Sequence, residues 1–135
     1  MLISTKGRYA LRVLIDMAEH NGNEYIKLKD IAERQEISEK YLESIVKQLV
    51  NHHIVVGLRG KGGGYRLTRE PDEYTLNDIL RAAEGDIAPI SCLEKGARPC
   101  ERAGDCRTLP MWKELNTLIT DYLNSKTLAD LMKKS

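Results

Sequence analysis

The chain has three cysteines, Cys92, Cys100 and Cys106, and they all lie within fifteen residues of one another. Their spacing, Cys-x7-Cys-x5-Cys, falls in a stretch rich in glycine, proline and charge, which predicts an irregular loop over residues 86–107. Such a loop can bring three thiolates to one centre, and thiolates suit zinc and iron–sulfur clusters. Three ligands leave a fourth position to another residue, to a partner subunit or to solvent.

The spacing matches neither the paired Cys-x2-Cys of a zinc ribbon nor the four-cysteine run of a bacterial ferredoxin. Three nearby arginines, Arg98, Arg102 and Arg107, could lower the pKa of a thiol, which would serve metal binding or oxidation sensing equally. From the residues alone, three readings stay open: a bound metal or cluster, a two-cysteine redox switch, and unligated thiols.

Upstream of the cysteines, the sequence predicts a helix-turn-helix. A helix over residues 5–20 is followed by two shorter ones, over about 27–35 and from the N-cap Ser38 to about His52, with a tight turn at 35–37. In the last of these, Leu42, Ile45 and Leu49 belong to a stripe that faces the core, so the opposite face of residues 38–47 is expected to read bases in a major groove.

A β-hairpin follows the expected recognition helix. Residues 54–58 and 65–67 are β-branched or aromatic strand candidates, and between them lie four glycines and two basic residues, Arg59 and Lys61. This is the layout of a winged helix, in which a basic tip meets DNA phosphate. A plain hairpin turn is one alternative, and a nucleotide-binding loop is weaker because the loop leads from strand to strand. The predicted DNA-binding residues are Ser38, Glu39, Lys40, Tyr41, Glu43, Ser44, Lys47, Arg59, Gly60, Lys61, Gly62 and Gly63.

The second half of the chain predicts a helix from the cap Thr75 to Gly85, the cysteine loop, a long helix over about 109–123 and a short one over 128–132. The long helix carries one broad apolar face, which is either core or a dimer seam. Helix-turn-helix proteins bind DNA as two-fold dimers, which favours the seam. The predicted dimerisation residues are Trp112, Leu115, Leu118, Ile119 and Tyr122.

The composition limits the class of protein. The 135 residues, 41% hydrophobic and 30% charged, predict a DNA-binding part over 1–70 with net charge +3 and a cysteine-loop and dimerisation part over 71–135 with net charge −2. No apolar stretch could span a membrane, and the N-terminus lacks a secretory signal, so we expect a cytoplasmic protein. No histidine lies near the thiols and no nucleophile–base pair is evident, so we expect no enzyme.

Together these segments resemble the Rrf2 family of bacterial winged-helix regulators over essentially the full length. The resemblance rests on residues 3–12 (ISTKGRYALR), 37–43 (ISEKYLE), 59–67 (RGKGGGYRL) and 75–79 (TLNDI), on Glu84-Gly85, on the three-cysteine loop, and on Trp112.

Within the family, the cysteines are similar to those of the iron–sulfur branch. The resemblance implies a homodimer with crossed long helices, DNA contacts around Ser38 to Glu43 and Arg59 to Gly64, and a cluster on the three cysteines, [2Fe–2S] in preference to [4Fe–4S]. Two departures concern the fourth ligand: Leu109 stands where cluster-assembly regulators have a histidine, and Arg8 aligns with the aspartate of the nitric-oxide-sensing repressor. The cysteine spacing is also wider by two residues. The branch that regulates cysteine metabolism shares the N-terminal motifs but lacks this loop, so we favour the iron–sulfur branch over it.

The sequence therefore predicts a mainly α fold: a winged helix-turn-helix with a β-hairpin wing and a long C-terminal dimerisation helix. The predicted function is that of a dimeric repressor that binds double-stranded DNA and responds to an iron–sulfur cluster. The alternatives are a thiol- or zinc-based winged-helix regulator without a cluster and, in another class, a small iron–sulfur electron carrier.

Overall fold

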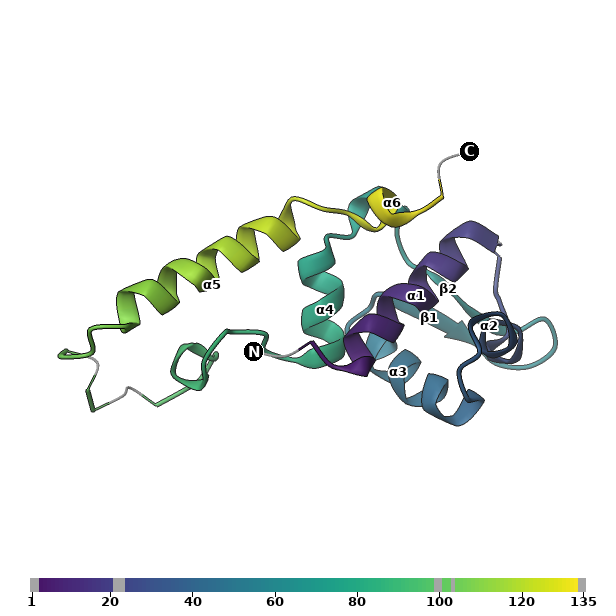
Figure 1. Cartoon of the computed structure of the whole chain (residues 1–135). Coiled ribbons are helices and arrows are strands. Elements are labelled where there is room, and N and C mark those ends of the chain that lie inside the picture. The colour runs from purple at the N-terminus through teal and green to yellow at the C-terminus, as the bar shows by residue number, and fades with distance from the viewer. Residues whose placement is uncertain (1–2, 21–23, 99–100, 103, 134–135) are drawn as a thin grey trace.

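The computed structural model describes residues 3–20, 24–98, 101–102 and 104–133, and it is mainly helical. One two-stranded antiparallel hairpin stands beside the helices (Figure 1). The elements in chain order are α1 (Thr5–His20), α2 (Leu28–Gln35), α3 (Glu39–Asn51), β1 (Val55–Leu58), β2 (Gly64–Leu67), η1 (Pro71–Glu73), α4 (Leu76–Glu84), η2 (Ser91–Leu93), α5 (Leu109–Asn124) and α6 (Leu128–Leu131).

The helix-turn-helix forms where the sequence predicts it. Helix α2 ends because Glu36 takes the left-handed conformation, with a φ of 54°, and turns the chain toward α3. Helix α3 begins at Ser38, whose hydroxyl oxygen accepts a hydrogen bond from the amide of Tyr41 at 3.2 Å. The apolar stripe of α3 is buried, with Leu42 and Leu49 fully inaccessible, and this burial anchors the helix to α1.

The wing is the β1–β2 hairpin, paired from Val55↔Leu67 to Leu58↔Gly64. The hairpin also pairs with a residue just before α2, which the sequence did not predict. Ile26 and Tyr65 exchange two backbone hydrogen bonds of 2.8 Å. Gly64 makes this approach possible: it has a φ of +144°, and a Cβ atom there would lie 2.3 Å from the carbonyl oxygen of Ile26.

One hydrophobic core runs across the boundary predicted at residue 70. Tyr74 is fully buried, and its hydroxyl donates to the carbonyl of Ile54 at 2.7 Å while accepting from the amides of Thr68 and Arg69, both at 2.9 Å. Helix α6 also returns to this core, and its Leu128 is fully buried. The division into 1–70 and 71–135 stays a prediction. In the structure, α4 and α6 pack with the winged helix.

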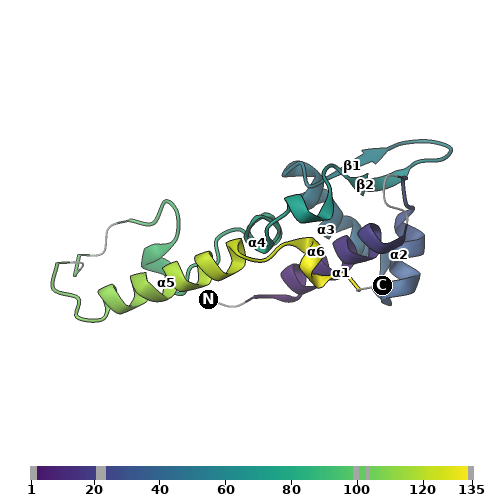
Figure 2. The ribbon, with the colours of Figure 1, turned by 90° about the horizontal axis from the view of Figure 1, so that it is seen from above.

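Helix α5 differs from the other helices. It extends away from the winged-helix body in both views, and the cysteine loop runs out along it (Figures 1 and 2). None of its residues is buried. Among the residues that the structure describes, no helix combines the length and the apolar character needed to cross a membrane.

Candidate nucleic-acid interface and cysteine loop

The outer face of α3 presents a row of polar side chains. Ser38, Glu39, Lys40, Glu43, Ser44 and Lys47 are all exposed, as predicted from helical spacing. Tyr41 is only half-buried, because its ring packs against the ring of Tyr9 in α1 with centroids 5.8 Å apart. This face is therefore available to a ligand with hydrogen-bonding edges, and Tyr41 links it to α1.

The tip of the wing carries positive charge on a glycine turn. Arg59 and Lys61 are exposed, as are Gly60 and Gly62. Gly63 is buried: its amide donates to the carbonyl of Gly60 at 3.0 Å, and a Cβ atom there would meet the carbonyl oxygen of Leu58 at 2.2 Å. Gly63 thus closes the turn that holds the two cations outward.

The recognition helix and the wing enclose a groove of about 710 Å³. Its basic groups come from three segments: Lys27 before α2, Lys47 on α3, and Arg59 at the wing tip. Among the described residues, the salt bridges all lie elsewhere, at Asp16 and Asp86. Glu43 also lines the groove, so three cations and one carboxylate face it, and this net positive charge fits a polyanionic backbone.

The sequence reading missed Lys27, Asn51 and Tyr65 as groove residues. A signal existed for Lys27, because Tyr25 and Ile26 form a short aromatic and β-branched pair before α2. Two residues are too few to predict a strand, and the partner of Ile26 becomes evident only once the hairpin is placed.

Two of the three cysteines lie within the described residues. Cys92 is exposed in η2, and Cys106 is half-buried just before α5; both are free thiols. The hydroxyl of Thr108 lies 3.5 Å from the sulfur of Cys106, and this hydrogen bond lowers the pKa of the thiol, helped by the amides of Thr108 and Leu109. Cys106 is therefore biased toward thiolate, the form that binds metal and reacts with oxidants.

The third cysteine, Cys100, lies outside the described residues. Within the described part of the chain, no three His, Cys, Asp or Glu side chains gather as a metal site would require. The donor chemistry fits a thiophilic metal or an iron–sulfur cluster nevertheless, because Cys92 and Cys106 are free and Cys106 has a lowered pKa. Leu109, at the position where a histidine was expected by resemblance, offers no donor side chain.

The cysteine loop is fastened to α4 at its first residues. The carboxylate of Asp86 accepts from the amide of Ala88 at 2.9 Å and from the amide of Lys95, and it pairs with Arg81 at 3.4 Å. The Lys95 amide is the largest influence that lowers the pKa of Asp86, so the carboxylate stays charged in this network.

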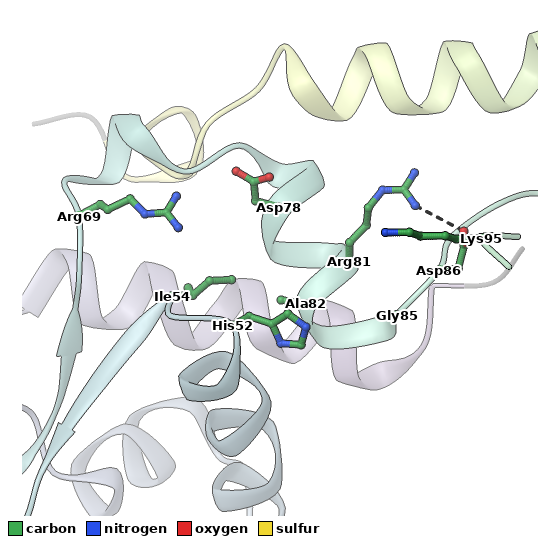
Figure 3. A pocket seen from close by; sticks show the side chains of 9 residues that line it. All are labelled: His52, Ile54, Arg69, Asp78, Arg81, Ala82, Gly85, Asp86 and Lys95. Atoms are coloured by element: carbon green, nitrogen blue, oxygen red, sulfur yellow. Dashed lines mark hydrogen bonds and ion pairs between the residues drawn. The ribbon is translucent and has the colours of Figure 1, made fainter.

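Beyond this anchor, the loop and the winged helix are separated by an open cavity of about 650 Å³. Figure 3 shows Asp86 and Lys95 on one side of it and Arg69 on the other, with His52 at the end of α3 below. The continuous connection between the two sides is α4, which carries Arg81.

The predicted dimerisation residues all lie on α5 and are all accessible. Leu118 and Tyr122 are 67% and 59% exposed, while Trp112, Leu115 and Ile119 are half-buried. Helix α5 touches the body through Leu123 and through Thr120, whose hydroxyl accepts from Arg81 at 3.3 Å, but its exposed apolar face is typical of an interaction surface.

Comparison with known proteins gives one consistent result. The family model described as "Rrf2: Iron-dependent Transcriptional regulator" matches residues 3–134. The transcriptional regulator IscR of Sodalis glossinidius is 36% identical over 132 residues, which are 98% of this chain and 79% of that protein. The transcriptional regulator CymR of Bacillus subtilis is 40% identical over 131 residues, which are 97% of this chain and 89% of that protein.

Solved structures agree with these relatives. The solved structure of CymR, the global cysteine regulator of B. subtilis, superposes with a TM-score of 0.75 at 38% identity, covering 97% of this chain and 95% of that one. IscR of T. potens gives a TM-score of 0.73 at 33% identity, covering 100% and 94%. The predicted winged-helix fold is thereby confirmed, and CymR proves as similar to this chain as IscR.

Proposed function

The chain belongs to the Rrf2 family of transcriptional regulators, and from that premise we propose that it is a homodimeric repressor that responds to an iron–sulfur cluster. Cys92, Cys100 and Cys106 hold the cluster, with [2Fe–2S] preferred to [4Fe–4S]. Its relatives are named as transcriptional regulators, so the chain is a regulator and not an enzyme. The proposal places it in the cytoplasm, on double-stranded DNA.

One observation carries the sensing part of the proposal. The cysteine loop is fastened through Asp86 to α4, and α4 packs in the same core as the recognition helix. A change in the loop therefore reaches the DNA-reading element without crossing a flexible linker. When bound, a cluster would supply a centre whose assembly needs iron and whose loss follows oxidation.

The DNA part of the proposal rests on the groove between α3 and the wing. Lys27, Lys47 and Arg59 line it and would contact phosphates, which fix register without reading sequence. Ser38, Lys40 and Glu43 are exposed on α3, and they would contact base edges. The exposed apolar face of α5 would join two protomers, so that two recognition helices meet two half-sites.

The test begins with anaerobic purification, a visible spectrum and an iron and sulfide count. A DNA duplex selected by the protein from a random library then serves as the probe in an anisotropy titration, with and without the cluster. We expect at least about a tenfold difference in Kd, equal to about 1.4 kcal/mol of coupling. Cys92→Ala and Cys106→Ala should abolish the colour, whereas Ser91→Ala, at the neighbouring exposed hydroxyl, should keep it. Equal affinity in both states would refute cluster coupling.

A second candidate is a thiol switch without any cluster, favoured by the lowered pKa of Cys106 and by the similarity to CymR. It predicts a colourless, iron-free protein whose DNA affinity changes with a mild oxidant and returns with a thiol reductant. A colourless protein with stoichiometric zinc and no such response would instead make the metal structural.

A further inference from the structure

Glu84, the last residue of α4, makes an unusual contact with the start of α1. One oxygen of its carboxylate, Oε1, accepts three hydrogen bonds: from the amide of Ser4 at 2.9 Å, from the hydroxyl of Ser4 at 2.6 Å and from the amide of Gly7 at 2.7 Å. The first amides of a helix have no partner within the helix, and they carry the positive end of its dipole. Glu84 thus caps α1 from a different helix, about 80 residues along the chain.

Gly7 is the residue that lets this carboxylate approach. A glycine inside a helix is less favourable than alanine, so its presence within α1 requires a reason. A Cβ atom at Gly7 would lie 2.6 Å from Oε1 of Glu84, well inside van der Waals contact. The cap therefore depends on both residues: Gly7 leaves the space that the carboxylate of Glu84 occupies.

On one side, Glu84 adjoins the cysteine loop. Gly85 follows it and ends α4 with a φ of 83°, and Asp86 then binds the amides of Ala88 and Lys95. Because Gly85 alone separates Glu84 from Asp86, a loop that reorders around Asp86 pulls on the cap as well.

On the other side, Glu84 adjoins the recognition helix through α1. Tyr9 lies two residues after Gly7, and its ring contacts the ring of Tyr41 with centroids 5.8 Å apart. The guanidinium of Arg12 lies over the Tyr9 ring at 5.0 Å and donates to the carbonyl of Gln35 at 2.6 Å, at the end of α2. The start of α1 is thereby tied to both helices of the helix-turn-helix.

We propose that Glu84 is the positioning residue through which the state of the cysteine loop reaches the recognition helix, by way of the α1 cap and the Tyr9–Tyr41 contact. The proposal rests on the proposed function, because it describes how cluster state changes DNA affinity. The cavity between the loop and the winged helix supports it, because Lys95 faces Arg69 and His52 across open space (Figure 3). The loop is instead held to α4 by the ion pair between Asp86 and Arg81, and Asp86 also accepts from the amide of Lys95.

The first test compares the ratio of DNA Kd values with and without cluster. We expect a ratio of about tenfold in the wild type, and a ratio below about threefold in both Glu84→Ala and Gly7→Ala. The methyl group in Gly7→Ala displaces the Glu84 carboxylate from the cap without changing Glu84 itself. Glu84→Gln keeps an acceptor and should retain an intermediate ratio. Asp72→Ala, which removes an exposed carboxylate from η1, should leave the ratio unchanged. A purely structural Glu84 would weaken both states alike, and an unchanged ratio in Glu84→Ala and Gly7→Ala would overturn the proposal.

The second test needs no cluster. Amide hydrogen exchange at Gly7 is measured in cluster-free protein, with Asp86→Ala compared with the wild type. The proposal expects release of the loop anchor to speed exchange at Gly7 by at least about fivefold, while the amide of Leu49 in the core stays protected. Unchanged exchange at Gly7 would refute the connection even if DNA binding proved independent of a cluster, so this failure is distinct from failure of the proposed function.

Discussion

Replacement of Lys61 by alanine tests whether the wing contacts phosphate. Lys61 is exposed at the tip of the β1–β2 hairpin, so its loss removes charge without disturbing the core. In a dimer the substitution removes two cations, and the slope of log K against log salt should fall by about 1.8, at about 0.9 per phosphate contact. From about 50 to 200 mM salt, the variant should therefore lose about twelvefold less affinity than the wild type.

The assay is an anisotropy titration against the selected duplex at five salt concentrations. A scrambled duplex of the same length is titrated in parallel, because the loss of a phosphate contact should weaken binding to both sequences equally. Lys126→Ala is the matched control: it removes the same charge from an exposed site between α5 and α6, away from the wing (Figure 1). An unchanged slope in Lys61→Ala, or an equal decrease in the control, would refute the assignment of the wing to DNA.

Three further predictions follow from packing and charge. Burial raises the pKa of Asp16, but hydrogen bonds from Arg34 and Gln35 outweigh it and hold that pKa below its ordinary value. The resulting stabilisation is present above about pH 4 and is lost as pH falls through the lowered pKa. Asp16→Asn should therefore cost about 3 kcal/mol in urea unfolding at pH 7 and flatten the dependence of stability on acid pH. Leu118→Asp should weaken dimerisation on the order of a thousandfold, from about 2 kcal/mol of lost burial per protomer, as seen by light scattering; a stable dimer would place the seam elsewhere. Gly64→Ala should open the wing and speed exchange at the Tyr65 amide, and a protected amide would contradict its role.

Local signals predicted most of the fold. Helical spacing and caps placed α3 and α4 within two residues, because Ser38 and Thr75 accept from the amides of Tyr41 and Asp78 as an N-cap must. Glycine and basic residues between two β-branched runs identified the wing. These features depend on interactions between residues that are close in the sequence, so the sequence alone is enough to predict them.

Contacts between distant segments were beyond such reasoning. The pairing of Ile26 with Tyr65 and the return of Leu128 to the core join residues with no sequence signal for each other. The cap of α1 by Glu84 is similar, since nothing in the pattern of α4 indicates a partner 80 positions upstream. The resemblance predicted the iron–sulfur branch of the family, but IscR and CymR are both similar to this chain, so cluster sensing and thiol sensing both stay proposals.

The cysteine loop connects two helices, α4 and α5, that differ in how firmly they are packed. At its start, Asp86 is fastened to α4, which belongs to the core, so motion there is transmitted as displacement of packed helices. At its end, Cys106 lies three residues before α5, none of whose residues is buried, so in the proposed dimer the loop and a second protomer would both influence the angle of this arm. In that dimer both effects would change the distance between the two recognition helices, and the half-sites on a DNA duplex are spaced by about 34 Å. A ligand on the cysteines would therefore alter operator binding through spacing, even if each recognition helix kept its internal structure.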